Sequence, residues 1–447
     1  MQLTDRELTQ IINNEAKIYA MYTVENRAIP NLIDGLKPVQ RFMLYRAIQL
    51  AKGKSDKFHK LASVAGGVAD AGYHHGENSA QEAGALMANT WNNNFPFLDG
   101  QGNFGSRLVQ QAAASRYIFC RVSENFNKVY KDTEIAPEHE DLEHLPPRFY
   151  LPIIPTVLLN GVRGIATGYS TSILPHDFES IVRCTEQALN GETVSMPTVA
   201  FPQFRGEVYC TEPNKYELHG TYNFTSKTQM YISEIPYQFD RAKYVEKVLD
   251  PLEDAGLITY DDDCSKEGFG FKIKFRKDYK LPTDVTELDE KIKRDFKLVE
   301  RVSQNIVVID ENGKLHDRFE NSAQLVEHFV KVRLSFVEKR IGFMIEKSKH
   351  AFELAYAKAL FIREVTNEKI QVKGKKRSEL KEELAQLPAL AGFEDQLLAM
   401  NIFHMTEDEM ANLLKKAKEA KEQMDYWKST DALTEYKNDI KELKSIL

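Results

Sequence analysis

The spacing of apolar residues predicts a long helical arm near the end of the chain. Apolar side chains recur there at intervals of four, three and four residues, at Leu325, Phe329, Val332 and Phe336. This is the helical period, and we expect the helix to cover about 322–365. A second long helix, rich in Lys and Glu, is predicted over 406–447, with a compact apolar insert around 387–393 between the two. Together they predict a long antiparallel coiled-coil arm.

The first part of the chain is typical of a helix-rich domain. A helix is predicted over residues 4–26 and ends before Pro30. Pro38 suits the first turn of a second helix, predicted over 39–51. A third helix is predicted over 77–91, where consecutive asparagines end it. Helix, turn, helix and then short strands indicate a winged helix-turn-helix, whose third helix would enter the DNA major groove.

The middle of the chain has the pattern of a mixed α+β domain. Proline pairs place a boundary near residue 150, and residues 151–320 alternate short β-branched runs with turns. The run 229–235 is one such strand, and a helix over about 241–255 interrupts the strands. The three aspartates at 261–263 predict a charged loop rather than a magnesium site.

Composition indicates a globular protein of two or three domains. The 447 residues are 42% hydrophobic and 28% charged, which is typical of folded domains. No apolar run reaches the length of a transmembrane helix, and the first residues lack the apolar stretch of a secretion signal. The four cysteines, Cys120, Cys184, Cys210 and Cys264, have no zinc-ligand spacing. We therefore expect a cytoplasmic protein without a membrane partner.

Charge alone does not predict a nucleic-acid partner. The formal net charge is −7, which argues mildly against one, but local charge decides such binding. Residues 1–60 hold ten Lys and Arg against six Asp and Glu. This excess is consistent with a DNA-binding surface and equally with an ordinary solvated helix face.

A tyrosine beside a fixed cation is the strongest candidate for chemistry. The glycine-rich run 99–106 leads through small residues into Arg116 and Tyr117. A free phenol has a pKa near 10, so only about 0.1% is phenolate at pH 7. A neighbouring guanidinium always carries charge and can hold the phenolate or a scissile phosphate. The dipeptide by itself is a weak signal, and its surroundings decide its meaning.

Four blocks in a fixed order resemble the DNA breakage–reunion core of type IIA DNA topoisomerases. They are the segments 27–41, 73–79, 97–106 and 116–117. The resemblance continues through Asn160-Gly161, the run Gly164 to Ile173, and Phe204-Arg205-Gly206. It is clear over about residues 20–240 and only architectural afterwards. The length and the missing parts resemble the split enzymes of T-even-type phages within this family.

The resemblance implies roles for individual residues. Tyr117 would attack a backbone phosphorus and become linked to the 5′ phosphate. The transferring phosphate would be stabilised by the remaining catalytic candidates: Arg116, Arg27, Lys37, His74 and His75. DNA contacts would come from Ile173, Arg41, Ser79 and Gln40. The adjacent histidines and Gln40 follow the eukaryotic pattern of the family. Ile173 would wedge between base pairs, with a core isoleucine as the alternative.

The resemblance also implies a division of labour. Gly100, Gly102 and Gly105 satisfy the bare dinucleotide-binding pattern, but the preceding residues make a poor core strand. The sequence contains no GxxxxGK[ST] loop, and its only Asp-x-Asp run is the one at 261–263, which is predicted to be a charged loop. We therefore expect no metal site in this chain. Mg²⁺ and ATP would be held by a large partner subunit with metal-binding and ATPase domains.

Together these inferences predict an α+β multidomain DNA-cleaving subunit of an ATP-dependent type II topoisomerase. Residues 1–150 would form the winged-helix cleavage domain, 151–320 an α/β tower-like DNA-bending domain, and 321–447 the arm with a C-terminal dimerisation gate. A homodimer would break both strands of double-stranded DNA and pass a second duplex through the break. The alternative is a non-catalytic architectural DNA-bending protein on the same scaffold. A tyrosine recombinase is a third possibility, but a different all-helical core would then be expected.

Overall fold

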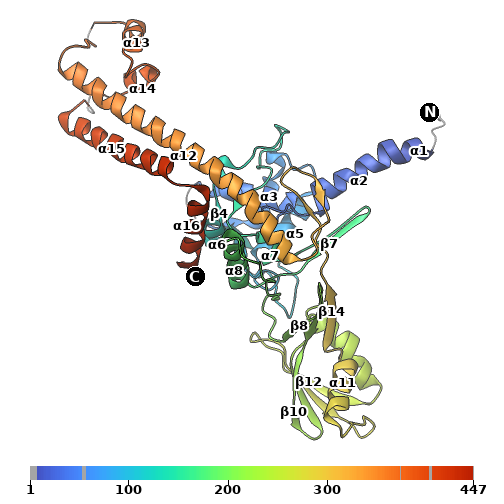
Figure 1. Cartoon of the computed structure of the whole chain (residues 1–447). Helices are drawn as coiled ribbons and strands as arrows, with labels where there is room; N and C mark the ends of the chain where they lie inside the picture. Colours follow the sequence, from blue (N-terminus) through green and yellow to red (C-terminus); the bar gives the residue numbers. More distant parts are fainter. Residues whose placement is uncertain (1–7, 53–56, 373, 402–404, 446–447) are drawn as a thin grey trace. The chain divides into compact units, whose positions relative to one another are not determined.

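The computed structural model describes residues 8–52, 57–372, 374–401 and 405–445 (Figure 1). The chain forms two compact units. The first comprises residues 1–333 together with 440–447, and the second comprises 334–439. Both contain helices, and the first also contains the sheets, so the fold class is mixed helix and strand.

A continuous helical segment opens the described chain. It consists of α1 (Leu8–Gln10), the π-helical turn η1 (Ile11–Ala16), α2 (Lys17–Thr23) and the π-helical turn η2 (Val24–Ala28). It confirms the predicted helix from residue 8 onward and continues two residues beyond 26. Residues 4–7 of that prediction lie outside the described residues.

The next three helices and a small sheet form the predicted helix-turn-helix arrangement. Helix α3 (Pro38–Ala51) begins at its proline as expected, followed by α4 (Leu61–Gly66) and α5 (Glu77–Ala88). Strands β1 (His59–Lys60), β3 (Phe119–Val122) and β2 (Leu98–Gln101) form an antiparallel sheet in this order. The predicted end of the third helix at 91 was wrong. The helix ends at Ala88 because Asn89 is extended and its Oδ1 accepts from the Asn92 amide at 2.9 Å.

Shorter elements complete the N-terminal half of the first unit. They are the 3₁₀ turns η3 (Ala69–Ala71) and η4 (Thr133–Ile135), helices α6 (Glu124–Val129), α7 (Thr156–Leu159) and α8 (Phe178–Leu189), and the paired strands β4 (Tyr130–Lys131) and β5 (Leu151–Pro152). Strands β6 (Val162–Ala166) and β7 (Tyr169–Ile173) form an antiparallel hairpin, which extends from the body of the unit in Figure 1.

Residues 201–303, called here the sheet region, carry two antiparallel sheets. One has the order β10-β11-β13-β12 and the other β14-β9-β8. Their bounds are β8 (Glu207–Glu212), β9 (Lys215–His219), β10 (Thr221–Ser226), β11 (Gln229–Glu234), β12 (Ile258–Asp262), β13 (Phe271–Phe275) and β14 (Val299–Ser303). The helices are α9 (Arg241–Tyr244), the π-helical turn η5 (Val245–Leu249), α10 (Asp250–Asp254) and α11 (Val285–Asp295).

One apolar core joins the helices and sheets of this region. Met230 and Ile232 of β11 pack with Tyr244 and Ile292 from the helices. The predicted strand at 229–235 and helix at 241–255 are confirmed to within one residue. The first two of the aspartates predicted to form a loop instead end strand β12, where Asp262 pairs with Arg241.

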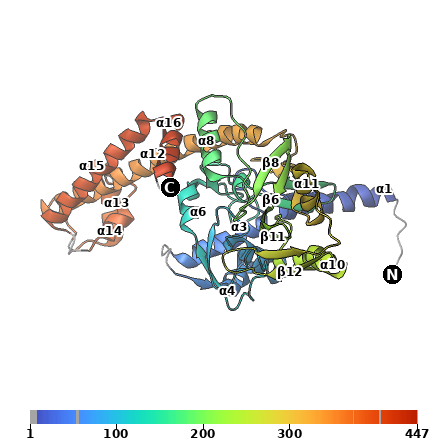
Figure 2. The ribbon, with the colours of Figure 1, turned by 90° about the horizontal axis from the view of Figure 1, so that it is seen from below.

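The second unit is built from long helices (Figure 2). Helix α12 (Ser322–Thr366) is 45 residues long and enters this unit at residue 334. It is followed by α13 (Arg377–Ala385), α14 (Glu394–Leu398), α15 (Glu407–Ser429) and α16 (Ala432–Ser445). In both views α15 runs alongside α12. The insert packs Leu384, Leu390 and Leu397 into an apolar core that it shares with Ala357 and Phe361 of α12.

The predicted single helix over 406–447 was wrong. The chain breaks after Ser429, because Thr430 is extended and Asp431 caps a new helix by accepting from the Thr434 amide at 2.9 Å. Residues 446–447 lie outside the described residues. Two short paired strands, β15 (Val308–Ile309) and β16 (Leu315–His316), lie before α12. The proposed boundaries at 150 and 320 stay predictions.

Candidate functional site

Tyr117 lies on an irregular segment between β2 and β3, and its side chain is 66% exposed. Its neighbour Arg116 places its guanidinium carbon 4.7 Å from the centre of the phenol ring. The segment begins with a tight turn at Gly105, whose φ is +84°. A Cβ at that position would meet the carbonyl oxygen of Gln110 at 2.7 Å, so glycine is required for this turn.

Hydrogen bonds fix the segment immediately around the tyrosine. The Ser115 hydroxyl donates to Oε1 of Gln81 on α5 at 2.6 Å. The Tyr117 amide donates to the Ala114 carbonyl at 2.9 Å, and the Leu61 amide donates to the Ile118 carbonyl at 3.0 Å. The backbone of Tyr117 is therefore positioned by α4 and α5, while its side chain faces solvent.

The two histidines precede α5, and His75 belongs to a small aromatic cluster. Its Nε2 lies 3.2 Å from the hydroxyl of Tyr22, and its ring meets the edge of Tyr73 at 5.2 Å. Burial lowers the pKa of His75, and the charges of Arg27 and His74 lower it further. His75 is therefore neutral at pH 7 and can accept a proton or donate from its other ring nitrogen.

The remaining cationic candidates lie on neighbouring elements. Arg27 is exposed on η2, a π-helical turn of the kind often found at functional sites. Lys37 precedes α3, and its Nζ donates to the Arg163 carbonyl of β6 at 2.6 Å. Burial lowers the pKa of Lys37. The bond to Arg163 ties this lysine to the β6–β7 hairpin.

Arg41 is buried and already paired. It is 5% exposed, and its Nε and Nη2 donate to the two carboxylate oxygens of Asp34 at 2.7 and 2.9 Å. Nη2 also lies 3.1 Å from the Leu36 carbonyl. The structure therefore does not support the predicted direct contact of Arg41 with DNA phosphate, because the guanidinium is used inside the protein.

Gln40 and Ser79 both have local structural partners. The Gln40 side chain accepts from the Lys37 amide at 2.9 Å and so caps the start of α3. The Ser79 hydroxyl lies 2.8 Å from the Tyr73 hydroxyl and donates to the Gly76 carbonyl at 2.7 Å. Ser79 remains exposed at the start of α5, so its contact with DNA stays a prediction, as does that of Gln40.

The β6–β7 hairpin presents a different isoleucine from the one expected. Ile173, the predicted wedge, lies at the base of the hairpin and is 2% exposed. Ile165, opposite Ser170 near the turn, is 88% exposed. In this conformation Ile173 belongs to the core, which was the alternative interpretation, and Ile165 is the apolar side chain available to a ligand.

Five of the six predicted catalytic residues form two groups, and the sixth, Lys37, is bonded to the Arg163 carbonyl of β6. Arg27, His74 and His75 are grouped by the charge interactions around His75. Tyr117 and Arg116 form the other group, with Ser115 and Gln81. Within the described part of the chain, no hydrogen bond or ring contact joins Tyr117 to the first group.

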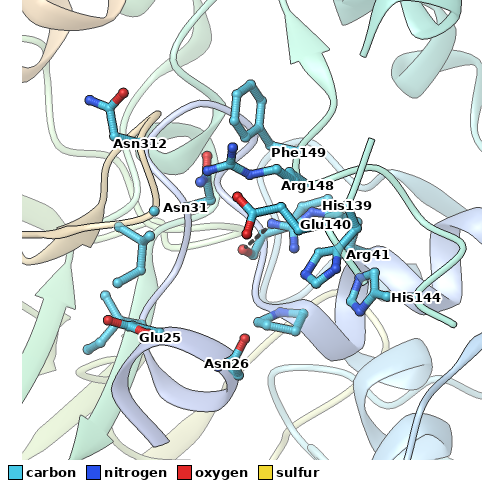
Figure 3. A pocket seen from close by; sticks show the side chains of 15 residues that line it. Glu25, Asn26, Asn31, Arg41, His139, Glu140, His144, Arg148, Phe149 and Asn312 are labelled. Carbon is cyan, nitrogen blue, oxygen red and sulfur yellow. Dashed lines mark hydrogen bonds between the residues drawn. The ribbon is translucent and has the colours of Figure 1, made fainter. Parts of the chain in front are cut away.

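A pocket of the first unit is lined by residues that do not include Tyr117 (Figure 3). Its volume is about 300 Å³, and its lining includes Arg41, Arg148 and the stacked pair His139 and His144. Burial lowers the pKa of His144 to about 4, so this histidine is neutral in the folded state at pH 7. The tyrosine itself lies on an open surface, which suits a ligand larger than the pocket.

A metal or nucleotide site does not fit the described residues. Among them, no group of three or more His, Cys, Asp or Glu side chains could hold a metal ion. The glycine-rich run is followed by irregular chain and then β3, whereas a dinucleotide site needs a helix there. In the described helices, no stretch has the length and apolarity needed to cross a membrane.

A family model for the A subunit of DNA gyrase and topoisomerase IV matches residues 27–444. The chain belongs to this family. It is 62% identical over 444 residues to the DNA topoisomerase medium subunit of Enterobacteria phage T4, covering 99% of this chain and 100% of that protein. It is 28% identical to DNA topoisomerase 2 of Plasmodium falciparum, covering 99% of this chain and 34% of that protein.

A solved structure supports the same assignment. The crystal structure of the Plasmodium falciparum topoisomerase II DNA-binding, cleavage and re-ligation domain matches with a TM-score of 0.88 and 28% identity, covering 97% of this chain and 63% of that one. The chain is thus homologous to the DNA-cleavage and re-ligation subunit of type II topoisomerases. The resemblance and the fold class inferred from sequence are confirmed. Family membership implies Mg²⁺ and ATP in the holoenzyme.

Sequence reasoning missed several residues of this candidate site. Tyr22, Gln81 and Asp34 contact His75, Ser115 and Arg41, respectively. Each is separated in sequence from its partner by a turn or a whole helix. Only Asp34 carries a signal, since it lies seven residues before Arg41 in the same sequence block.

Proposed function

We propose that Tyr117 is the nucleophile with which this chain makes a transient double-strand break in DNA. The observation that carries the proposal is an exposed phenol, with Arg116 beside it, on a segment held at both sides by α4 and α5. The membership in the topoisomerase family gives this arrangement its chemical context.

The reaction exchanges one phosphoester for another. The Tyr117 phenolic oxygen forms a bond to a backbone phosphorus, and the bond from that phosphorus to the 3′ oxygen breaks. The phenol loses its proton and the leaving 3′ oxygen gains one, so the 5′ phosphate stays on the tyrosine. Attack by the 3′ hydroxyl reverses every step and reseals the strand. No net hydrolysis occurs.

The cations stabilise the charge that spreads over the phosphate oxygens in the transition state. Among the cations, Arg116 is already next to the phenol, while Arg27 and Lys37 come from η2 and from the segment before α3. His74 and His75, from the segment before α5, would add hydrogen bonds to the phosphate. A bound duplex would cover both groups and bring the scissile phosphate between them. Neutral His75 suits proton transfer to or from an ester oxygen.

Two copies of the chain would act together. A staggered double-strand break needs two nucleophiles in fixed relation, which two-fold symmetry supplies. Residues 334–439, with their apolar insert, would form the dimerisation gate at the end of the arm. A second duplex would pass through the protein-linked break.

Partner chains would supply what this chain does not hold. It spans about a third of the cellular topoisomerases that it matches, and its described residues offer neither a metal cluster nor a nucleotide loop. A large subunit would therefore hold Mg²⁺ and ATP. The likeness to a phage protein supports a phage-encoded enzyme that acts in the host cytoplasm during DNA replication.

DNA bending is the second part of the proposal. Ser79 and Gln40 would contact the duplex from α5 and α3, and the β6–β7 hairpin would approach it with an apolar side chain. Ile173 would serve as the wedge only if DNA binding opens the base of the hairpin. A purely architectural bending protein would share these surfaces but would have no need of the Arg116–Tyr117 pair.

This function is tested by determining which DNA end, 5′ or 3′, carries the protein when the break is trapped. The assembled enzyme is incubated with end-labelled duplex DNA and Mg²⁺ and then denatured with detergent. The proposal expects protein on the 5′ ends, leaving 3′ hydroxyls that a polymerase can extend. Protein on the 3′ ends would contradict it, and the absence of any covalent complex would favour the architectural alternative.

A further inference from the structure

Arg107 lies on the segment that leads to Tyr117, yet its side chain is buried among residues of the sheet region. It is only 5% exposed. Its guanidinium carbon lies 4.5 Å from the ring centre of Tyr237, 5.3 Å from that of Phe269 and 5.7 Å from that of Phe204. These three rings, called here the aromatic cage, surround the cation with electron-rich faces.

The polar partners of Arg107 come from the same region. Its Nη2 lies 3.3 Å from Oε1 of Glu234 and 3.2 Å from the Ile235 carbonyl. Within the described residues, Nε and Nη1 have no hydrogen-bond acceptor. Such a group is expensive to bury, so the ring faces, the Glu234 carboxylate and the nearby charge of Glu300 stabilise it. An arginine that only held a surface loop in place could stay in water and would not need aromatic rings and a carboxylate around it.

The Phe204-Arg205-Gly206 run of the family resemblance builds this cage. Phe204 is one of its three rings, and the Arg205 amide donates to the other carboxylate oxygen of Glu234 at 3.1 Å. A Cβ at Gly206 would collide with the Phe204 ring and with the His219 carbonyl. The run therefore fixes both the ring and the carboxylate that receive Arg107.

Leu108 adds a second anchor next to the first. Its side chain packs against the apolar core of the sheet region, and its carbonyl accepts from the Arg241 amide at 3.2 Å. At the other end of the segment, Ile118 is tied to Leu61 at the start of α4. The nucleophile thus lies between one anchor on the sheet region and another on the helix-turn-helix.

We propose that Arg107 is a positioning residue for DNA cleavage, which fixes the segment before Tyr117 to the sheet region. This inference rests on the proposed function of Tyr117. Residues 102–118 contain no helix or strand, so individual anchors hold the segment in place, and Arg107 is a buried side chain among them. Arg107 couples the nucleophile to the region that would bend the duplex. Arg107 itself is buried and does not touch DNA.

The test uses the assembled enzyme and the double variant Arg107→Met with Glu234→Gln. Changing both residues avoids leaving one buried charge unpaired. The matched control is Arg301→Met with Glu217→Gln, which removes an exposed ion pair of 2.9 Å from the same sheet region. Duplex affinity, bend angle by energy transfer and the single-turnover rate of covalent complex formation are measured for each protein.

If Arg107 is a positioning residue, the double variant should change the cleavage rate but not the binding or bending of DNA. DNA affinity and bend angle should stay near those of the control. The rate of covalent complex formation should fall on the order of a hundredfold, as expected for a nucleophile displaced by about 1 Å. Hydrogen exchange should become faster in residues 104–117 and not in β11 or β13. A wild-type cleavage rate, or affinity and cleavage that fall in parallel, would overturn the proposal.

A second variant covers the case in which the double variant does not fold. Phe269→Leu keeps the ion pair and an apolar side chain but removes one ring of the cage, so the same separation is expected with a smaller loss of rate. Unchanged cleavage in a folded Phe269→Leu protein would then overturn the proposal. Tyr117→Phe is measured in parallel, because covalent complex in that protein would refute the proposed function instead.

Discussion

The guanidinium carbon of Arg116 lies 4.7 Å from the centre of the Tyr117 ring. The cation thus lies against the phenol that it would assist. Both side chains are exposed, so a bound phosphate can replace the ring as the partner of the guanidinium. This exchange would bring the positive charge of the guanidinium next to the phosphate without moving the backbone.

Substitution of Arg27 should change the salt dependence of DNA binding, whereas substitution of Arg41 should change the free energy of unfolding. Arg27 is exposed, so Arg27→Met should lower the slope of log affinity against log salt by about one when it contacts a phosphate. Arg41 is paired with Asp34 inside the protein, so Arg41→Met should leave this slope unchanged. Because Arg41→Met removes one member of a buried ion pair, it should lower the free energy of unfolding of the protein by about 3 to 5 kcal/mol.

Salt titrations of duplex binding and denaturant unfolding of both variants check this pair of expectations. Arg301→Met, in an exposed residue, serves as the control for stability. A reduced salt slope for a folded Arg41→Met protein would return Arg41 to the DNA-binding surface.

Substitutions of the two hairpin isoleucines should also have different effects on stability and on DNA bending. Ile173 is buried, so Ile173→Ala should lower the free energy of unfolding by about 2 to 5 kcal/mol. Ile165→Ala removes an exposed side chain and should change stability by less than about 0.5 kcal/mol. If Ile165 enters the duplex, its variant should bend DNA less.

Bend angles from energy transfer, measured with both variants at saturating protein, decide which residue acts. A full bend with Ile165→Ala and a reduced bend with a folded Ile173→Ala protein would support opening of the hairpin base and the original wedge assignment.

Acid should destabilise the first unit through a buried histidine. Burial lowers the pKa of His176 to about 4, whereas an unfolded histidine titrates near 6.5. The unfolded chain therefore binds a proton first as the pH falls. The stability present above pH 6.5 should be lost progressively down to about pH 4, by about 3 kcal/mol for this residue. His144, with a pKa of about 4, acts in the same direction.

Denaturant unfolding at pH 7.5 and at pH 5 measures this effect. His176→Gln should be less stable than the wild type at pH 7.5, because it loses the contacts to Leu158 and Ser322. Its stability should depend less on pH. Equal pH dependence in the two proteins would exclude His176 as a cause.

The full chain should sediment as a dimer at micromolar concentration without DNA. The insert of the second unit packs its apolar side chains against Ala357 and Phe361 of α12, so its removal uncovers the end of that helix and leaves the first unit intact. Deletion of about 366–405, with the helices bridged, should weaken dimerisation and leave DNA binding by the first unit in place. A monomeric full-length chain would count against the proposed gate.

The parts of the fold that were predictable from sequence are those with local signals. Pro38 marks the start of α3, and the helical period from Leu325 to Phe336 predicts a helix of more than 40 residues. The break at Thr430 was missed because Lys- and Glu-rich sequence continues on both sides of it. Its signal was Asp431, a capping residue whose side chain competes with the helix backbone.

The candidate site was less predictable, because its contacts are long-range. The sequence indicates Tyr117, Arg116 and the histidine pair through their motifs. It does not show that Ile173 is buried or that Arg107 enters an aromatic cage from a segment 97 or more residues away in sequence. Burial and cation–ring contacts depend on how the hairpin and the sheet region pack, which no local pattern records.

The most direct test of the central claim is the yield of detergent-trapped protein–DNA complex from the assembled enzyme carrying Tyr117→Phe. The substitution removes one oxygen from an exposed ring, so folding and duplex binding should be unchanged. Tyr356→Phe, at another exposed tyrosine, is the matched control. The account predicts no covalent complex with Tyr117→Phe and a wild-type yield with the control. Covalent complex at wild-type yield with Tyr117→Phe would contradict it.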